Sequence, residues 1–285
     1  MSISATRTYL EMIKVEHSVF ALPFAFVGMM YAAGGWPGWR VFGLVVLAMV
    51  SARSAAMALN RLADAKIDAL NPRTASRAIP KGDLKAPQVV AFLIVSVALF
   101  FTSAALLNPL TLALAPLALL VLMFYSYTKR FTWLCHLFVG LSLGLAPAAA
   151  WVAVTGEFSW APLFWILAVM FWTGGFDVLY ALQDEEFDRA NGLHSIPARF
   201  GRRKAIWISR IFHLLTVVFL VFAGLRIGAG VAYFIGCAFA AALLTYEQTL
   251  VSEKDISKLN FAFFTLNGYV SIGFFAFCLA DHLLR

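Results

Sequence analysis

The chain has 285 residues, of which 62% are hydrophobic and 13% charged, and its mean hydropathy is +0.83. This composition is too apolar for a soluble domain and is typical of a polytopic membrane protein. The net charge of +7 does not indicate nucleic-acid binding, because the basic residues are spread between apolar stretches, where membrane topology explains them.

Apolar stretches of about 20 residues, the length of a membrane-spanning helix, recur along the whole chain. Before them, residues 5–16 mix charged and apolar side chains, as a helix at the membrane surface does. The nine predicted spans are 18–36, 41–60, 87–107, 109–127, 133–153, 160–181, 204–224, 228–246 and 260–280. Their short connections predict antiparallel neighbours in one bundle. We therefore expect an all-α polytopic fold with a single transmembrane domain over residues 1–285.

Nine spans place the loops after the second, fourth, sixth and eighth helices on the same side as the N-terminus, where they would form a cap. Of the 22 Lys and Arg residues, all but Arg40, Arg226 and Arg285 lie on this side. Because basic loops stay in the cytoplasm, we expect an integral protein of the bacterial cytoplasmic (inner) membrane, with its N-terminus and cap facing the cytoplasm.

Residues 60–82 concentrate charge in an otherwise apolar chain. Asn60, Asp64 and Asp68 are spaced four apart, which places them on one face of a helix over roughly 12 Å. Solvated loops would show scattered charges instead. Acidic groups at the ends of membrane helices are costly and usually functional, so this set is a candidate site.

A second charged stretch covers residues 177–201. Asp177, Asp184 and Asp188 are spaced seven and four apart, which again predicts one helical face. Both stretches contain the pattern D-x-x-x-D-x-x-N. Tyr180 lies within the second stretch and is a candidate substrate-binding residue.

The two acidic sets are predicted to face one cytoplasmic cavity. Without a cation such carboxylates repel one another, which raises some of their pKa values. Oxygen ligands without Cys or His partners select a hard ion, so Mg²⁺ is the expected cofactor, and its open positions commonly bind phosphate oxygens. The candidate catalytic and metal-binding residues are Asp64, Asp68, Asp184 and Asp188, with Asp177 as a further metal ligand.

Basic residues on the same side can neutralise a phosphate, although each can also be an ordinary topological charge. Arg73, Arg77 and Lys129 are the best candidates, because they lie closest to the acidic sets or at an adjacent helix end. A Mg-bound diphosphate at the mouth of an apolar bundle indicates a ligand with a lipid tail. Some of the 27 Phe residues would line an isoprenoid tunnel.

Arg53 lies within a predicted span, about two helical turns from Asn60 on the same face. A buried arginine is expensive and seldom without function. Its predicted partner is a carboxylate-bearing or phenolic co-substrate, and the alternative is an ion pair with Asp177. Asn60 is predicted to orient a metal ligand or the acceptor hydroxyl.

The remaining reactive side chains show no site pattern. The cysteines, which lack metal or disulfide spacing, are predicted to be buried and reduced: Cys135, Cys237 and Cys278. Four of the five histidines are predicted to be core or interface residues: His17, His136, His194 and His213. Among them, His194 is the one placed to reach a phosphate. Glu185 and Glu186 turn away from the face of Asp184, so we expect them to be solvated.

Several segments resemble the motifs of UbiA-type intramembrane aromatic prenyltransferases. The first aspartate motif is N-R-L-A-D-A-K-I-D with R-T-A-S-R-A-I-P-K-G, and the second is D-V-L-Y-A-L-Q-D-E-E-F-D with S-I-P-A-R-F-G. Residues 125–132, Y-S-Y-T-K-R-F-T, resemble the Tyr-Pro-x-x-Lys-Arg-x-Thr segment, with Ser126 where proline is usual. The resemblance covers essentially the whole chain. It implies that Mg²⁺ and diphosphate are held by Asn60, Asp64, Asp68, Asp177, Asp184 and Asp188, with Arg53 and Lys129 lining the site.

Many members of this family carry Asp directly after the motif asparagine, whereas this chain has Arg61 and therefore one carboxylate fewer. N-R-x-x-D, with K-V-E-H-S-V-F-A-L-P-F, resembles the 4-hydroxybenzoate polyprenyltransferase branch. Similar sequences in the futalosine route to menaquinone use 1,4-dihydroxy-6-naphthoate. The resemblance implies Mg-dependent transfer from a polyprenyl diphosphate to one of these aromatic acceptors in ubiquinone or menaquinone biosynthesis. The other expected partner is the lipid bilayer, and the sequence gives no reason to infer an obligatory protein partner.

Two other functions remain open at this stage. An ion- or proton-coupled transporter also uses membrane carboxylates, but its coupling groups lie near mid-bilayer in broken helices. Here the acids lie at helix ends on one side, which favours chemistry at a membrane face. Prenyl transfer to haem, chlorophyll or phospholipid precursors would share the diphosphate site and differ in the acceptor pocket.

Overall fold

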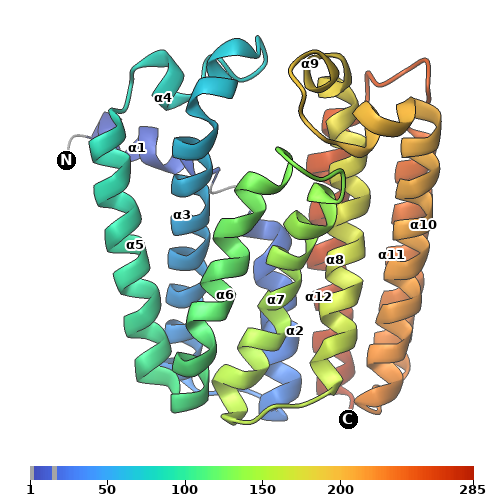
Figure 1. Ribbon diagram of the computed structural model, residues 1–285. Coiled ribbons are helices and arrows are strands. Elements are labelled where there is room, and N and C mark those ends of the chain that lie inside the picture. The colour runs from blue at the N-terminus through green and yellow to red at the C-terminus, as the bar shows by residue number, and fades with distance from the viewer. Residues whose placement is uncertain (1–2, 15–17) are drawn as a thin grey trace.

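The computed structural model describes residues 3–14 and 18–285, and these residues form a bundle of helices without a strand (Figure 1). The helices are α1 Ile3–Met12, α2 Ser18–Ala33, α3 Trp39–Leu70, α4 Ala78–Lys81, α5 Ala86–Leu107, α6 Pro109–Thr128, α7 Cys135–Thr155, α8 Ala161–Tyr180, α9 Glu185–Ala190, α10 Ile196–Arg226, α11 Val231–Thr249 and α12 Asn267–Leu283. The 3₁₀ turn η2, Ala181–Asp184, joins α8 to α9, and the π-helix η3, Phe261–Leu266, precedes α12. The predicted all-α membrane fold is confirmed.

Eight helical segments in the described part of the chain are long and apolar enough to cross a membrane. They are α3, α5, α6, α7, α10, α11, the segment from α8 to α9 and the segment from η3 to α12. The apolar helix α2, at the first predicted span (18–36), is shorter, so the total of nine spans stays a prediction. Figure 1 shows α1, α4 and α9 at the end of the bundle that holds the N-terminus, with the C-terminus at the opposite end. The predicted core or interface position of His17 lies outside the described residues.

Two helices extend beyond the predicted spans by more than one helical turn. The first is α3, which continues to Leu70 instead of ending at residue 60, so the first acidic set lies on one unbroken helix as predicted. The second is α10, which begins at Ile196 instead of residue 204, with the Ser195 hydroxyl capping its first turn. A bend follows at Gly201, whose φ of 78° is a conformation that glycine tolerates.

Small residues let the central helices α2, α7 and α8 approach closely. A Cβ atom added at Gly140 of α7 would overlap the carbonyl oxygen of Met170 in α8. One added at Gly28 of α2 would overlap the carbonyl oxygen of Pro147 in α7. Such close backbone contacts are typical of membrane helix packing, where van der Waals contact replaces the hydrophobic effect as the driving force.

Large aromatic residues fill the other half of the bundle, where α8 packs against α10, α11 and α12. Trp165, Trp172, Tyr233 and Phe274 are completely buried there. Their polar atoms are paired: Trp165 Nε1 donates to the Tyr233 hydroxyl at 3.1 Å, and that hydroxyl donates to the carbonyl oxygen of Leu220 at 2.8 Å. The closely packed core therefore lies between α8, α10, α11 and α12. The helices α3, α5, α6 and α7 enclose a cavity.

Gly140→Ala should destabilise the bundle, because the added methyl group meets the backbone of α8 and the two helices must separate. We expect a loss of about 1–3 kcal/mol, the cost of overpacking, measured as a lower thermal unfolding midpoint in detergent. Gly43→Ala in α3 is the matched control, since no atom lies within 4 Å of the position that its methyl group would occupy. Equal midpoints for the two variants would contradict the close packing of α7 on α8.

Candidate active site

The two aspartate stretches meet at the capped end of the bundle. Just after α3, the Asn71 side chain donates to Asp184 Oδ1 at 3.0 Å. Arg73 donates through Nε to the same oxygen at 2.9 Å and through Nη2 to Asp184 Oδ2. Asp184 is the last residue of η2. The prediction that these remote segments come together is therefore confirmed.

Arg73 is the charged partner in this contact. Its burial favours the neutral form, but the hydrogen bond and negative charge of Asp184 outweigh burial, so the pKa of Arg73 lies above its ordinary value. Its guanidinium carbon also lies 5.4 Å from the centre of the Tyr180 ring, within cation–π range. Arg73 thus joins the first stretch to both a carboxylate and an aromatic ring of the second.

Asp64 is 2% exposed and is surrounded by basic groups from the loop after α6. Lys129 Nζ lies 2.8 Å from its Oδ2, and Arg130 Nη2 lies 2.8 Å from its Oδ1. Asn60, one turn earlier on α3, donates to Oδ2 at 3.2 Å. Lys129 is therefore beside the first acidic set, as the sequence predicted. Arg130, which is not among the site residues predicted from the sequence, approaches Asp64 as closely as Lys129 does.

Asp68 has its own cation. Arg77 Nη1 donates to both carboxylate oxygens of Asp68, at 2.7 and 2.8 Å. The Thr74 hydroxyl donates to the backbone carbonyl of Asp68 at 3.1 Å. The chain after α3 thus turns back on the helix end, which positions both Arg73 and Arg77 over the acidic face.

The third loop of the cap is attached through its backbone. The amide of His194, after α9, donates to the carbonyl of Lys129 at 2.7 Å. Asp188 interacts with the Ser195 hydroxyl and with the charges of Asp184 and Lys129. The loops after α3, α6 and α8 consequently form one connected cap over the bundle.

Asp177 pairs with a histidine that the sequence did not single out. His136 Nδ1 lies 2.7 Å from Asp177 Oδ2, while its Nε2 accepts a hydrogen bond from the amide of Ile196 at 3.2 Å. Since Nε2 is an acceptor, the proton is assigned to Nδ1, which donates to the carboxylate. His136 is a buried core residue, as predicted, but its contact with Asp177 had no signal in residue spacing.

The second acidic set does not share one continuous helical face, so that prediction is wrong. The α-helix ends at Tyr180, and a 3₁₀ turn leads through Asp184 into α9. Gln183 Nε2 donates to the carbonyl of Tyr180 at 3.0 Å and satisfies an acceptor exposed at the helix end. Because a 3₁₀ turn advances about 120° per residue instead of about 100°, Asp184 and Asp188 leave the face of Asp177.

Glu185 is also placed differently from its prediction as a solvated charge. It is buried and accepts hydrogen bonds from Arg189 at 2.9 Å and from Arg202 at 3.0 Å. This double ion pair links α9 to α10 and offsets the cost of burying the carboxylate. Glu186, by contrast, is exposed as expected.

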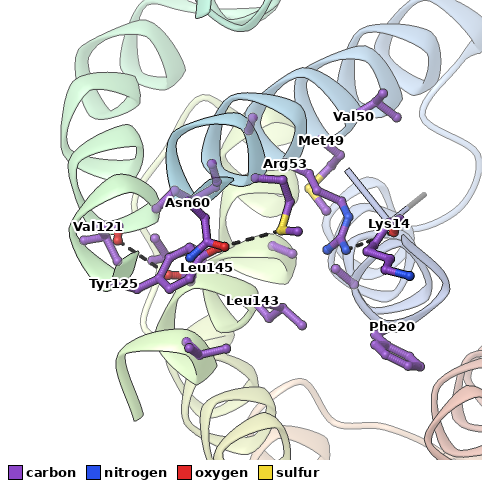
Figure 2. A pocket seen from close by; sticks show the side chains of 18 of the residues that line it. Lys14, Phe20, Met49, Val50, Arg53, Asn60, Val121, Tyr125, Leu143 and Leu145 are labelled. Atoms are coloured by element: carbon purple, nitrogen blue, oxygen red, sulfur yellow. Dashed lines mark hydrogen bonds between the residues drawn. The ribbon is translucent and has the colours of Figure 1, made fainter. Parts of the chain in front are cut away.

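Below the cap lies a cavity of about 1000 Å³, at the upper end of the range for ligand pockets. Six predicted site residues line it: Arg53, Asn60, Arg73, Arg77, Asp177 and Tyr180. The other five belong to the cap contacts at its rim: Asp64, Asp68, Lys129, Asp184 and Asp188. Away from the cap, side chains of α3, α5, α6 and α7 make the wall apolar, including Val121 and Leu143 (Figure 2).

The oxygen-rich cap is the candidate place for Mg²⁺. Within residues 3–14 and 18–285, no three acidic, His or Cys side chains are grouped closely enough to hold a metal. The carboxylates of Asp64, Asp68 and Asp184 are instead paired with basic side chains. The donors are nevertheless oxygen atoms from two converging segments, which suit a hard cation. The interleaved Arg and Lys residues suit the phosphate oxygens that complete such a site. The residues therefore fit a magnesium diphosphate in their chemistry.

Two arginines of α3 hold α1 against the cavity. Arg53 Nη2 donates to the carbonyl of Lys14 at 3.2 Å, a contact that Figure 2 shows, and this partner was not expected from the sequence. Arg61, 5% exposed, donates through Nε to the carbonyl of Met12 at 3.1 Å. In place of an additional carboxylate, this chain thus has a side chain that anchors α1, whose residues Thr8 and Glu11 line the cavity.

Comparisons with known proteins agree with this architecture. The model of the UbiA prenyltransferase family matches residues 21–269. The 4-hydroxybenzoate octaprenyltransferase of Vibrio campbellii is 30% identical over 275 residues, covering 95% of this chain and 96% of that protein. The protein of the same name from Saccharophagus degradans is 32% identical over 255 residues, covering 89% and 84%.

Solved structures show the same fold. A UbiA homolog from Aeropyrum pernix K1, in its apo form, has a TM-score of 0.85 and 33% identity, covering 93% of this chain and 98% of that chain. A UbiA homolog from Archaeoglobus fulgidus bound to DMAPP and Mg²⁺ has a TM-score of 0.76 and 20% identity, covering 98% and 100%.

Arg61→Met should loosen α1, because it removes a charged hydrogen-bond donor from a carbonyl at the helix end. A hydrogen bond to a charged group contributes about 1.5–3 kcal/mol, so hydrogen exchange of the α1 amides should accelerate by about tenfold or more. Arg40→Met is the matched control, since Arg40 likewise donates to a backbone carbonyl, that of Leu106, away from α1. Unchanged exchange in α1 would show that Arg61 does not anchor it.

Proposed function

Because the chain belongs to the UbiA prenyltransferase family, we propose that it transfers a polyprenyl group from a polyprenyl diphosphate to a hydroxylated aromatic carboxylate in respiratory quinone synthesis. The first candidate acceptor is 4-hydroxybenzoate, the acceptor in the names of its curated relatives. The observation that carries the proposal is the cavity, which has a charged end under the cap and an apolar body. A diphosphate with a long isoprenoid tail has the same two-part chemistry.

The cap would hold the diphosphate. Arg73, Arg77, Lys129 and Arg130 now neutralise carboxylates, and they can equally donate to phosphate oxygens. Mg²⁺ would be held by Asp64, Asp68, Asp177, Asp184 and Asp188. A UbiA homolog of the same fold that is bound to DMAPP and Mg²⁺ supports the choice of metal. The chemistry that the metal supplies is stabilisation of negative charge on the departing diphosphate.

The acceptor would lie deeper, where the cavity meets α3. Arg53 lines the cavity there and can pair with an aromatic carboxylate, while Asn60 can donate to a ring hydroxyl. As the diphosphate leaves, the prenyl carbon to which it was bonded becomes an allylic cation. The carbon of the acceptor ring ortho to the hydroxyl then attacks this cation. Loss of the ring proton restores aromaticity. The apolar wall keeps water from capturing the cation first.

We place the cap on the cytoplasmic side of a bacterial inner membrane, within a single domain that spans residues 1–285. All Lys and Arg residues except Arg40, Arg226 and Arg285 are assigned by the sequence to the side of the membrane on which the cap lies, which is the cytoplasmic pattern. In sealed vesicles of known sidedness, a diphosphate that does not cross the membrane should be consumed only when added on the cytoplasmic side. Consumption from the other side would reverse the orientation.

Purified protein supplied with Mg²⁺ and geranyl diphosphate should convert 4-hydroxybenzoate into a product heavier by one geranyl group, identified by mass spectrometry. 1,4-Dihydroxy-6-naphthoate is tested in parallel as the alternative acceptor. Omitting Mg²⁺ should stop the reaction. If neither acid is prenylated while the diphosphate still binds, the proposed acceptor class is wrong.

Asp64→Asn and Asp184→Asn should each lower kcat/KM by about 100-fold or more, the loss typical of removing one preorganised charge contact. These substitutions keep the side-chain size, and the Mg²⁺ concentration needed for half-maximal activity should rise. Glu186→Gln is the control, because Glu186 is exposed beside the same motif. Wild-type kinetics and Mg²⁺ dependence in either aspartate variant would remove that residue from the metal site.

A further inference from the structure

A network of polar side chains lies within the membrane-spanning helices and takes no part in the site described above. At its centre is Asn267, the first residue of α12, which is completely buried. Its Oδ1 accepts from Trp172 Nε1 at 2.6 Å. Its Nδ2 donates to Glu247 Oε1 at 3.0 Å and to the carbonyl of Ala262 at 3.1 Å. Both amide hydrogens and the amide oxygen are therefore engaged.

Such a network is costly to place in a membrane. Glu247 is 1% exposed, and its second oxygen has no hydrogen-bond partner among the described residues. An ionisable side chain inside a membrane is rare and usually functional. Trp172, Phe176 and Phe263 show that aromatic residues already fill this part of the core, so packing does not require a carboxylate and an amide here.

The network holds an irregular turn. Ala262, whose carbonyl binds Asn267, belongs to the π-helix Phe261–Leu266. A π-helix contains an extra residue in its turn, has weaker backbone hydrogen bonding than an α-helix and occurs frequently at functional sites. Relaxation to an α-helix would rotate the residues before the turn relative to α12 by about 100°. The Asn267 side chain opposes this change because it occupies a carbonyl within the turn.

The π-helix forms part of the cavity wall. Phe263 and Phe264 line the cavity together with Phe20, Phe176 and Tyr180, and we name these five residues the aromatic wall. The ring centre of Phe263 lies 4.1 Å from that of Tyr180, 5.1 Å from that of Phe176 and 5.8 Å from that of Phe20. Phe263 is therefore the ring that connects the others.

The aromatic wall adjoins the charged end of the cavity. Tyr180 has Arg73 over its ring, and Arg73 binds Asp184 of the cap. Asp177 lines the cavity one helical turn from Tyr180. A carbon cation released at the cap would consequently form beside this wall. Aromatic faces attract cations, and closely packed rings exclude water.

We infer that Asn267 and Glu247 are positioning residues that hold the π-helix so that Phe263 and Phe264 shield the allylic cation from water. The inference rests on the proposed prenyl transfer. In that reaction the bond between the allylic carbon and the diphosphate oxygen breaks, and diphosphate leaves with the electron pair. The cation then bonds to the ring carbon, which loses its proton, or to water, which loses a proton to give a prenyl alcohol. The aromatic wall favours the first product.

The test compares Glu247→Met with Glu247→Gln. Both keep the length of the side chain, but glutamine retains an oxygen that accepts from Asn267 and methionine replaces it with a weak acceptor. With Mg²⁺, geranyl diphosphate and 4-hydroxybenzoate, Glu247→Met should raise the ratio of geraniol to prenylated acid by about fivefold, the effect of about one hydrogen bond. Glu247→Gln should match the wild type.

Asp281→Asn is the control for general damage to α12. Asp281 is buried near the other end of this helix, where it accepts from Tyr31 and from the amide of Gly230 at 3.0 Å each. Its loss should lower the thermal midpoint and leave the product ratio unchanged. A lower total turnover at constant ratio in Glu247→Met would mean that the network has only a structural role, and would overturn the inference.

Two further variants keep the inference testable if Glu247→Met does not fold. Asn267→Asp retains the size of the side chain and removes both donors, so it should also raise the ratio. Phe264→Leu alters the aromatic wall directly and should raise the ratio without disturbing the network. An unchanged ratio in Phe264→Leu would overturn the shielding role. Absence of prenylated acid from the wild-type protein would instead refute the proposed function.

Discussion

The structure depends on the contact between Asp184 and the segment that follows α3. Asn71 and Arg73 bind this carboxylate from a position more than one hundred residues earlier in the chain. An arginine held by two parallel hydrogen bonds fixes both distance and orientation. The contact therefore fixes the distance and orientation between the cap ends of α3 and α8. Those two helices provide opposite sides of the cavity's charged end. The long connection through α5, α6 and α7 can vary in its lipid-facing residues without moving that end.

Electrostatics explains why the acids of the cap are interleaved with bases. Asp64 and Asp68 are nearly inaccessible to water, and each would be costly to bury without a cation. Lys129, Arg130 and Arg77 supply that charge from segments that end close to the same surface. The same basic side chains are suited to phosphate oxygens, so the ion pairs of the cap and the proposed binding of a magnesium diphosphate use the same charges. Because these groups lie at helix ends, the cost of desolvation stays lower than it would be at mid-membrane.

Sequence patterns predicted the features that repeat or concentrate charge. The apolar stretches marked most helices, and the spacing of Asn60, Asp64 and Asp68 placed them on one helix, because both signals depend on local geometry. The break at Tyr180 was missed, since a 3₁₀ turn here requires neither proline nor glycine. The contact of His136 with Asp177 was also missed, because it joins two helices and leaves no periodic trace. Burial of Glu185 depends on Arg202 of α10, which again only the tertiary fold brings near.

Arg61 and Asn267 show how buried polar groups can support a site by fixing another element of its wall. Arg61 lies within the first motif and donates to the carbonyl of Met12 at the end of α1, so it anchors a helix that lines the cavity. Asn267 uses its amide to hold an irregular turn under the aromatic wall. In both cases the alternative to the contact is an unpaired polar group in a region of low dielectric constant, which costs more than the same loss in water. A hydrogen bond in this environment therefore restricts geometry more strongly than its modest net stabilisation suggests.

Arg73 links the charged cap to the aromatic wall. Its guanidinium binds Asp184 of the cap and lies over the ring of Tyr180 in the wall. The charge distribution of the cap and the position of the wall are therefore coupled through one side chain.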